Sequence, residues 1–186
     1  MLANILRDYG TEYPLIQKSV GTEFTEKFND GDCILSTIRY YIENKVYKLD
    51  KDYKLSEPLS PLIPKKDAHL VIGLNPFPVF ANLDYITEKS LVVLNTNLGS
   101  RKSTKSVGEI VDLLDQFARI TISMNFNKLA NEMFGNLDLI VFILLGLITK
   151  QFKELIQKKY ILNILSSPKY NIKHNIEAFN LGYSLV

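Results

Sequence analysis

The sequence predicts an α/β fold whose sheet is mixed but mostly parallel, and three observations lead to this prediction. Two apolar runs, residues 68–74 and 91–94, are each long enough for a buried strand, and a helical segment lies between them. A strand–helix–strand unit of this kind places its strands parallel, with a right-handed crossover. Neither run alternates polar with apolar residues, so helices are expected on both faces of the sheet. Strands and helices also alternate along the rest of the chain, as in α/β proteins.

The helix of this central unit begins with Asn75 and Pro76. Asparagine is a good helix N-cap, and proline at the first helical position loses no hydrogen bond within the helix. Apolar side chains then recur at helical spacing, namely Phe77, Phe80, Ala81 and Tyr85.

The chain before this unit is expected to begin with a helix. Residues 1–9 place apolar side chains on one helical face, and Gly10 follows as a stop. A strand is expected over residues 14–19, whereas the state of residues 22–28 stays open.

A hairpin is expected next. Residues 29–31 carry a turn signal, and residues 33–42 are rich in isoleucine and tyrosine, as strands often are. A turn at residues 43–45 would lead into a second strand at residues 46–49. This hairpin would make the sheet mixed, and the proline-containing segment 50–64 then connects irregularly to the central unit.

After Asn95, a polar loop leads to Ser106 and a helix follows. The side chains expected to face inward from this helix are Val107, Ile110, Val111, Leu114 and Phe117. Residues 119–126 are expected to form a strand. Asn127 then caps a helix that runs through Met133 and ends at Gly135.

Three further helices complete the chain. Residues 137–148 are strongly apolar, but a transmembrane helix needs roughly 20 such residues, so a buried core helix is expected. Residues 152–165 form an amphipathic helix that ends at 166–168. The last helix covers residues 171–181 and ends at Gly182.

The composition is that of an ordinary soluble protein with one domain. Of its 186 residues, 46% are hydrophobic and 23% are charged, and the net charge is +2. This balance provides no strong attraction to nucleic acid or to a membrane, and no secretory signal is visible, so a cytoplasmic location is expected. The single cysteine, Cys33, excludes an internal disulfide and an iron–sulfur cluster held by this chain alone, because a cluster needs about four ligands.

One loop resembles a phosphate-binding motif. Residues 99–106 match the pattern G-x-x-x-x-G-K-S except that Thr104 replaces the second glycine. A solvated basic loop is the favoured interpretation. Its weak candidate residues for contacting an acidic partner or a coenzyme phosphate are Arg101, Lys102 and Lys105.

No other residues suggest catalysis or metal binding. His69 and His174 are far apart and lack a metal-ligand spacing, and His69 is expected to be a hydrogen-bonded structural histidine. Cys33 is interpreted as a small buried residue rather than a nucleophile. The lysines at positions 150, 153, 158 and 159 are interpreted as a solvated helix face.

Several motifs occur together in one order along the chain. Residues 60–64 read S-P-L-I-P, Ala68 and an apolar strand follow, and Leu94, Asn95 and Thr96 end the next strand. Gly135 and Asn136 precede the long apolar helix, and residues 175–183 read N-I-E-A-F-N-L-G-Y. This order closely resembles the gamma subunit, or gamma domain, of the 2-oxoacid:acceptor oxidoreductases, which act on pyruvate, 2-oxoglutarate or indolepyruvate.

The resemblance covers roughly residues 30 to 183 and implies a Rossmann-like three-layer domain. It implies that residues 1–186 form one pyruvate/ketoisovalerate oxidoreductase gamma-type domain. In this family, thiamine diphosphate, iron–sulfur clusters and coenzyme A are held on or with partner subunits, which decarboxylate a 2-oxoacid oxidatively and pass electrons to ferredoxin. This chain would therefore be an oxidoreductase subunit that is not catalytic alone.

The sequence also departs from the family pattern. The usual member begins with a strand and a glycine-rich turn, whereas this sequence begins at what looks like the following helix, so it is interpreted as an N-terminally truncated or degenerate member. Asn75 stands where the family usually has Glu, and Asp30 and Asp32 replace basic and small residues. If a strand is lacking, the isolated chain is expected to self-associate or to require its partner.

Three functional hypotheses follow. The first is a gamma-type accessory subunit of the oxidoreductase, bound to thiamine- and iron-sulfur-binding subunits. The second is a stand-alone degenerate paralogue that acts as a binding or scaffold protein. The third is a domain that binds a phosphate ligand through residues 99–106. The sequence does not identify the 2-oxoacid.

Overall fold

The computed structural model describes residues 1–28, 31–42, 60–99 and 105–185. Within these ranges, strands and helices alternate over residues 70–134, whereas a hairpin of two strands comes before this part and further helices follow it, and three short 3-10 helices join the elements. The strands are β1 (Ile16–Phe28), β2 (Gly31–Ile42), β3 (Leu70–Gly73), β4 (Leu91–Asn95) and β5 (Ile120–Met124). The helices are α1 (Leu2–Glu12), α2 (Pro76–Ala81), α3 (Val107–Phe117), α4 (Phe126–Phe134), α5 (Ile140–Gln151), α6 (Lys158–Leu165) and α7 (Asn175–Ser184), and the 3-10 helices are η1 (Leu83–Tyr85), η2 (Leu137–Leu139) and η3 (Pro168–Tyr170).

Strands β3, β4 and β5 form a parallel sheet in that order. Leu91 of β4 lies opposite Leu70 of β3 on one side and Ile120 of β5 on the other. The connection from β3 to β4 runs through α2, whose N-cap is Asn75: its side chain accepts a hydrogen bond from the Phe77 N–H at 2.9 Å. The predicted strand–helix–strand unit and its asparagine cap are both confirmed.

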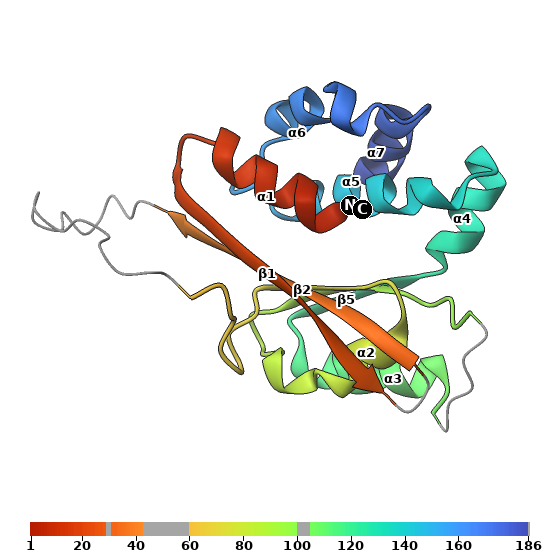
Figure 1. Ribbon diagram of the computed structural model, residues 1–186. Helices are drawn as coiled ribbons and strands as arrows, with labels where there is room; N and C mark the ends of the chain where they lie inside the picture. Colours follow the sequence, from red (N-terminus) through yellow and green to blue (C-terminus); the bar gives the residue numbers. More distant parts are fainter. Residues whose placement is uncertain (29–30, 43–59, 100–104, 186) are drawn as a thin grey trace, which may run out of the picture.

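Helices cover both faces of this sheet, as Figure 1 shows. Leu91 and Val93 of β4 point into a large core that contains side chains of α1, α4, α5, α6 and α7. Val92 and Leu94 point into a smaller core with α2 and α3. All four side chains are completely buried, which explains why the sequence of β4 does not alternate polar with apolar residues. The three-layer α/β architecture is confirmed.

The antiparallel hairpin consists of β1 and β2 and forms a separate two-stranded sheet. It runs diagonally across the molecule next to α1 (Figure 1). The segment 22–28, whose state stayed open, is the second half of β1, and it pairs with the strand predicted at 33–42. The strand expected at residues 46–49 lies outside the described residues.

Gly10 does not end the first helix, as predicted, but lies inside α1. A Cβ atom at this position would overlap the Ser19 side chain of β1 and would lie 2.8 Å from the Tyr40 ring of β2. The glycine is therefore needed for the close approach of helix and hairpin. Tyr40 strengthens this contact by donating a hydrogen bond of 2.6 Å to the Leu6 carbonyl oxygen.

Two predictions for the segment 107–135 are wrong in detail. Phe117, expected to face inward, is 47% exposed. Asn125, not Asn127, caps α4 by accepting a hydrogen bond from the Lys128 N–H at 2.9 Å, whereas Asn127 Oδ1 accepts a hydrogen bond from the Asn95 side chain. Gly135 ends α4 in the left-handed conformation, as predicted.

The last three helices also differ from the prediction at their ends. Residues 152–157 form turns rather than the first part of a long helix, and α6 begins only at Lys158. Helix α7 begins at Asn175 and continues through Gly182. Helix α5 is the central helix of the larger core, with eight consecutive buried residues from Phe142 to Thr149. Within the described ranges, every helix is too short or too polar to cross a membrane.

Candidate functional site

A hollow of about 290 Å³ lies where the parallel strands end at their carboxyl termini. Open α/β sheets bind ligands at this edge, because the strand ends and the following helix N-termini converge there. The hollow is lined by Met1, Leu74, Asn95, Asn127, Leu137, Asp138, Ile140 and Val141.

Asn95, the last residue of β4, forms hydrogen bonds to the neighbouring segments that line this hollow. Its side-chain amide donates to the Leu74 carbonyl oxygen at 3.2 Å and to Asn127 Oδ1 at 2.7 Å. Its Oδ1 accepts a hydrogen bond from the Phe126 N–H at 3.0 Å. The side chain therefore links the end of β3 to the start of α4. Asn95 is 2% exposed, so this amide has a structural role and is not available to a ligand.

The remaining lining is mainly apolar. Met1, Leu74 and Leu137 at its rim are exposed by 51%, 54% and 49%, which is unusual for large apolar side chains. The polar groups that face solvent are the half-buried amide of Asn127 and the exposed carboxylate of Asp138. This arrangement favours binding of an apolar group and contains no pair of acid and base for catalysis among the described residues.

The basic loop leaves the same edge of the sheet, because it follows the carboxyl end of β4 and leads into α3. The Asn75 side chain donates a hydrogen bond of 3.3 Å to the Leu98 carbonyl oxygen at the start of this loop. Lys105 is exposed, and its ammonium group lies 5.6 Å from the centre of the Phe80 ring. Arg101 and Lys102, the other two candidates, lie outside the described residues, so the structure does not test a site made by the three together. Gly99 has a φ of 61°, which suits glycine at this turn.

The N-terminus of α3 is already occupied by a carboxylate from the chain itself. Glu109 Oε2 accepts hydrogen bonds from the Ser106 N–H at 2.6 Å and from the Ser106 hydroxyl at 2.8 Å. The Ser106 oxygen in turn accepts a hydrogen bond from the Glu109 N–H at 3.2 Å, which completes a capping box. The hydrogen bond from the Ser106 backbone, followed by that from its hydroxyl, lowers the pKa of Glu109. The carboxylate stands where a phosphate would bind, which counts against the phosphate-ligand hypothesis.

The comparisons with known proteins agree with these features. The model of the family described as pyruvate ferredoxin/flavodoxin oxidoreductase matches residues 46–185, about three quarters of the chain. The chain belongs to this family. The resemblance inferred from the sequence motifs is therefore confirmed. No curated protein matches the sequence significantly.

A solved structure shows the same fold for this family member. The crystal structure of the keto/oxoacid ferredoxin oxidoreductase gamma subunit from Geobacter sulfurreducens PCA superposes with a TM-score of 0.60. The alignment covers 98% of this chain and 87% of that chain at 11% sequence identity. At this identity the likeness establishes a shared fold, and it confirms the Rossmann-like architecture.

A cluster of tyrosines, which the sequence analysis did not single out, joins α1 to distant parts of this family member. The Tyr9 hydroxyl donates to the Leu155 carbonyl oxygen at 2.6 Å and accepts from the Gln157 N–H at 3.0 Å. The Tyr9 ring stacks on Tyr13 with a centroid distance of 5.2 Å. Burial raises the pKa of Tyr9 to about 12. Because the hydroxyl is used in two structural hydrogen bonds, we assign it no role in binding.

The two histidines lie apart, as the sequence suggests, but His69 is not the hydrogen-bonded residue that was expected. Its side chain is exposed and makes no hydrogen bond within the described part of the chain. His174 lies 2.8 Å from Glu177 Oε2 through its Nδ1 atom. The described ranges contain no group of three or more His, Cys, Asp or Glu side chains arranged to hold a metal ion. Cys33 belongs to β2, but its side chain lies outside the described part.

Proposed function

We propose that this chain is a gamma-type, non-catalytic subunit of a 2-oxoacid:ferredoxin oxidoreductase complex. The observation that carries this proposal is the match of the family model over residues 46–185. The fold shared with the solved structure of a keto/oxoacid ferredoxin oxidoreductase gamma subunit supports it.

The residues of this chain do not fit an iron–sulfur cluster. Cys33 is its one cysteine, whereas the clusters are held by about four cysteine thiolates. We therefore assign the clusters to partner subunits, and we assign thiamine diphosphate and coenzyme A to them or to the assembled complex. The described lining of the hollow supports this division, since it offers apolar surface and amides rather than a catalytic pair.

In this proposal, residues 1–186 form one gamma-type domain that acts in the cytoplasm. The partner subunits carry out the oxidative decarboxylation and the electron transfer to ferredoxin. The basic residues Arg101, Lys102 and Lys105 are proposed to contact a partner surface or a coenzyme phosphate in the assembled enzyme. The isolated chain is proposed to self-associate or to depend on its partners, which light scattering after size-exclusion chromatography measures.

Co-expression with the thiamine- and iron-sulfur-binding subunits of the same organism tests the proposal. A tagged form of this chain should co-purify with them as a brown complex that oxidises a 2-oxoacid in the presence of coenzyme A. Purified alone, the chain should be colourless and inactive. The proposal is wrong if the partner subunits assemble and turn over fully without this chain, a result that would favour a stand-alone binding or scaffold protein.

A further inference from the structure

Four lysines gather where α5 ends and α6 begins. Lys150 lies in the last turn of α5, Lys153 lies in the connecting turn, and Lys158 and Lys159 are the first two residues of α6. We call these four residues the lysine turn. They are not one face of a single helix, as the sequence suggested, because α5 ends at Gln151.

Aromatic rings contact the ammonium groups of three members of the lysine turn, namely Lys150, Lys158 and Lys159. The Nζ atoms of Lys158 and Lys150 lie 4.4 Å and 5.2 Å from the centre of the same Tyr183 ring. Lys159 Nζ lies 4.8 Å from the centre of the Tyr160 ring. Cation–π contacts of this kind restrict the long side chains before any partner arrives, so less conformational entropy is lost on binding.

The positive charge of the lysine turn is not neutralised within the described part of the chain. The ion pairs in the described part of the chain are Lys65–Asp84, Lys128–Glu132, Lys169–Asp8 and His174–Glu177. None of these includes the lysine turn, although Glu154 lies between its members in sequence.

Helix α6 adds to the positive potential. Lys158 and Lys159 occupy its first two positions, where the helix dipole disfavours a cation. Gln157, the N-cap residue, makes no side-chain capping bond, and the first turn contains no acidic residue. The local structure therefore favours an external anion beside this turn.

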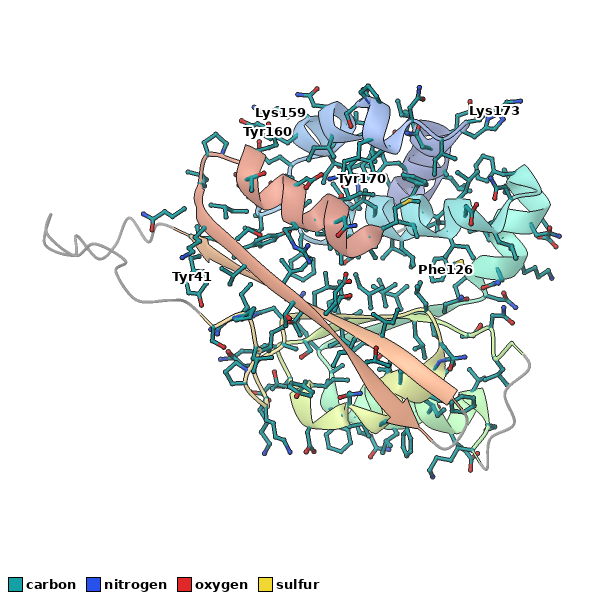
Figure 2. The ribbon with its side chains drawn as sticks, viewed as in Figure 1. Tyr41, Phe126, Lys159, Tyr160, Tyr170 and Lys173 are labelled. Carbon is teal, nitrogen blue, oxygen red and sulfur yellow. The ribbon has the colours of Figure 1, made fainter. Side chains whose placement is uncertain are left out.

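We propose that the lysine turn is the docking surface for an acidic patch on a partner subunit. This inference rests on the proposed function, because the partner is a subunit of the same complex. Figure 2 shows Lys159 at the outer edge of α6, where its side chain is exposed, whereas the neighbouring Tyr160 ring packs inward on Tyr13 with a centroid distance of 5.3 Å. A surface that combines tyrosine rings with cationic side chains is typical of protein–protein interfaces.

A protein partner fits the charge pattern better than a nucleic acid or a lipid surface does. Proteins that bind phosphate polymers usually carry a long basic stripe and a strongly basic pI. Here the net charge of the whole chain is only +2, and the four lysines lie within residues 150–159, with Lys150 and Lys158 beside the same Tyr183 ring. An acidic patch of similar size on a protein is the complementary surface.

Charge reversal in the full chain tests the proposal. We expect the double variant Lys150→Glu/Lys158→Glu to bind the co-expressed partner subunits at least about tenfold more weakly than the wild type. Wild-type binding should also weaken as the salt concentration rises, because ions screen such contacts. The variant Lys150→Arg/Lys158→Arg should retain the affinity.

A matched control changes the net charge by the same amount at the amino-terminal ends of β4 and β5. Lys89 and Arg119 are exposed and lie just before β4 and β5, and within the described part of the chain neither takes part in an ion pair. Lys89→Glu/Arg119→Glu should leave the affinity within about twofold. Circular dichroism checks that each variant is folded, and Lys153→Glu/Lys159→Glu replaces the first pair if it is not.

The outcomes separate this inference from the proposed function. If the wild type joins the complex, and the charge reversal in the lysine turn binds as tightly as the control reversal at Lys89 and Arg119, the docking surface is wrong and the proposed function stands. If the wild type joins no partner, both are wrong. If the reversal reduces binding to an oligonucleotide or to anionic vesicles but leaves the partner affinity unchanged, the lysine turn serves another ligand and the inference is overturned.

Discussion

Gly146 of α5 lies directly against the backbone of Phe179 in α7. A Cβ atom at Gly146 would overlap the Phe179 carbonyl oxygen and would lie 2.7 Å from the Tyr183 amide nitrogen. The reverse contact is just as close, because a Cβ atom at Gly182 would overlap the Ile143 carbonyl oxygen. The two helices therefore meet backbone to backbone at the centre of the larger core.

Gly146→Ala should destabilise the protein. An added methyl group must push α5 and α7 apart, and overpacking of this kind costs about 1 to 3 kcal/mol. The midpoint of urea unfolding, compared with that of the wild type, measures the effect. Gly108→Ala is the control, since the nearest atom to its new Cβ would be 3.9 Å away, and it should change stability by no more than about 0.5 kcal/mol. Equal midpoints for Gly146→Ala and the wild type would contradict the close packing of these helices.

Asn95→Asp should destabilise the hollow at the strand ends. The carboxylate would replace the amide that donates to the Leu74 carbonyl oxygen and to Asn127 Oδ1. It would thus leave acceptors facing acceptors in a buried position, which should cost about 3 kcal/mol. The repulsion raises the pKa of the new carboxyl group in the folded state, so stability should recover as the pH falls and the group is protonated.

Unfolding of Asn95→Asp at several pH values checks both parts of this prediction. Asn97→Asp is the control, because Asn97 Oδ1 only accepts a hydrogen bond from the Gly99 N–H at 3.3 Å and a carboxylate can do the same. The role assigned to Asn95 is incorrect if both variants unfold together.

Tyr9 should make the protein sensitive to alkaline pH. Burial raises the pKa of its hydroxyl from 10.0 to about 12, and burial also raises the pKa of Tyr40. Between pH 10 and about pH 12 the Tyr9 hydroxyl is deprotonated in the unfolded state but still protonated in the folded state, so deprotonation favours unfolding. The contribution of these two tyrosines to stability is therefore constant below about pH 10 and is lost above it, by about 1.4 kcal/mol per pH unit for each tyrosine.

The variant Tyr9→Phe separates this titration from the hydrogen bonds. At neutral pH it should lose about 1 to 3 kcal/mol, because the Leu155 carbonyl oxygen and the Gln157 N–H lose their partner. Above pH 10 its stability should fall less steeply than that of the wild type. Tyr160→Phe removes a hydroxyl with no hydrogen bond among the described residues, and its charge is the smallest cause of the raised pKa of Tyr9, so it should change both properties less than Tyr9→Phe does. Identical slopes for Tyr9→Phe and the wild type would refute this assignment.

Lys105→Ala should have little effect on the isolated chain. The side chain is exposed, and its contact with the Phe80 ring at 5.6 Å contributes no more than about 0.5 to 1 kcal/mol. Thermal unfolding measures the stability, and a phosphate-release assay with ATP tests the alternative function. ATP hydrolysis that is present in the wild type and absent in Lys105→Ala would revive the phosphate-ligand hypothesis.

Short-range sequence patterns are sufficient to predict the strand–helix–strand unit at the centre of the fold. Asn75 and Pro76 start α2 through interactions within a few residues of each other, so the sequence predicts that helix start correctly. The uninterrupted apolar run of β4 likewise reports burial on both faces. These features depend on near neighbours or on a periodic pattern, which a sequence displays directly.

The misplaced helix ends have a common cause. The backbone freedom of Gly10 and Gly182 predicts helix stops, but both lie within helices at positions where a Cβ atom would collide with Ser19 or Ile143. The turn at residues 152–157 interrupts a continuous amphipathic pattern where the Tyr9 hydroxyl binds its backbone. Neither effect is visible in the local sequence.

The sequence by itself determined the fold class, the family and the strand–helix–strand unit at its centre. Only the tertiary structure decided which glycines are contact points, and it brought the ammonium groups of Lys150 and Lys158 beside the same ring, that of Tyr183. Periodicity and capping are properties of adjacent residues, whereas packing depends on residues such as Tyr9 and Gln157, which are 148 positions apart along the chain. The distances between such residues follow from how the layers pack, and the linear pattern does not contain them.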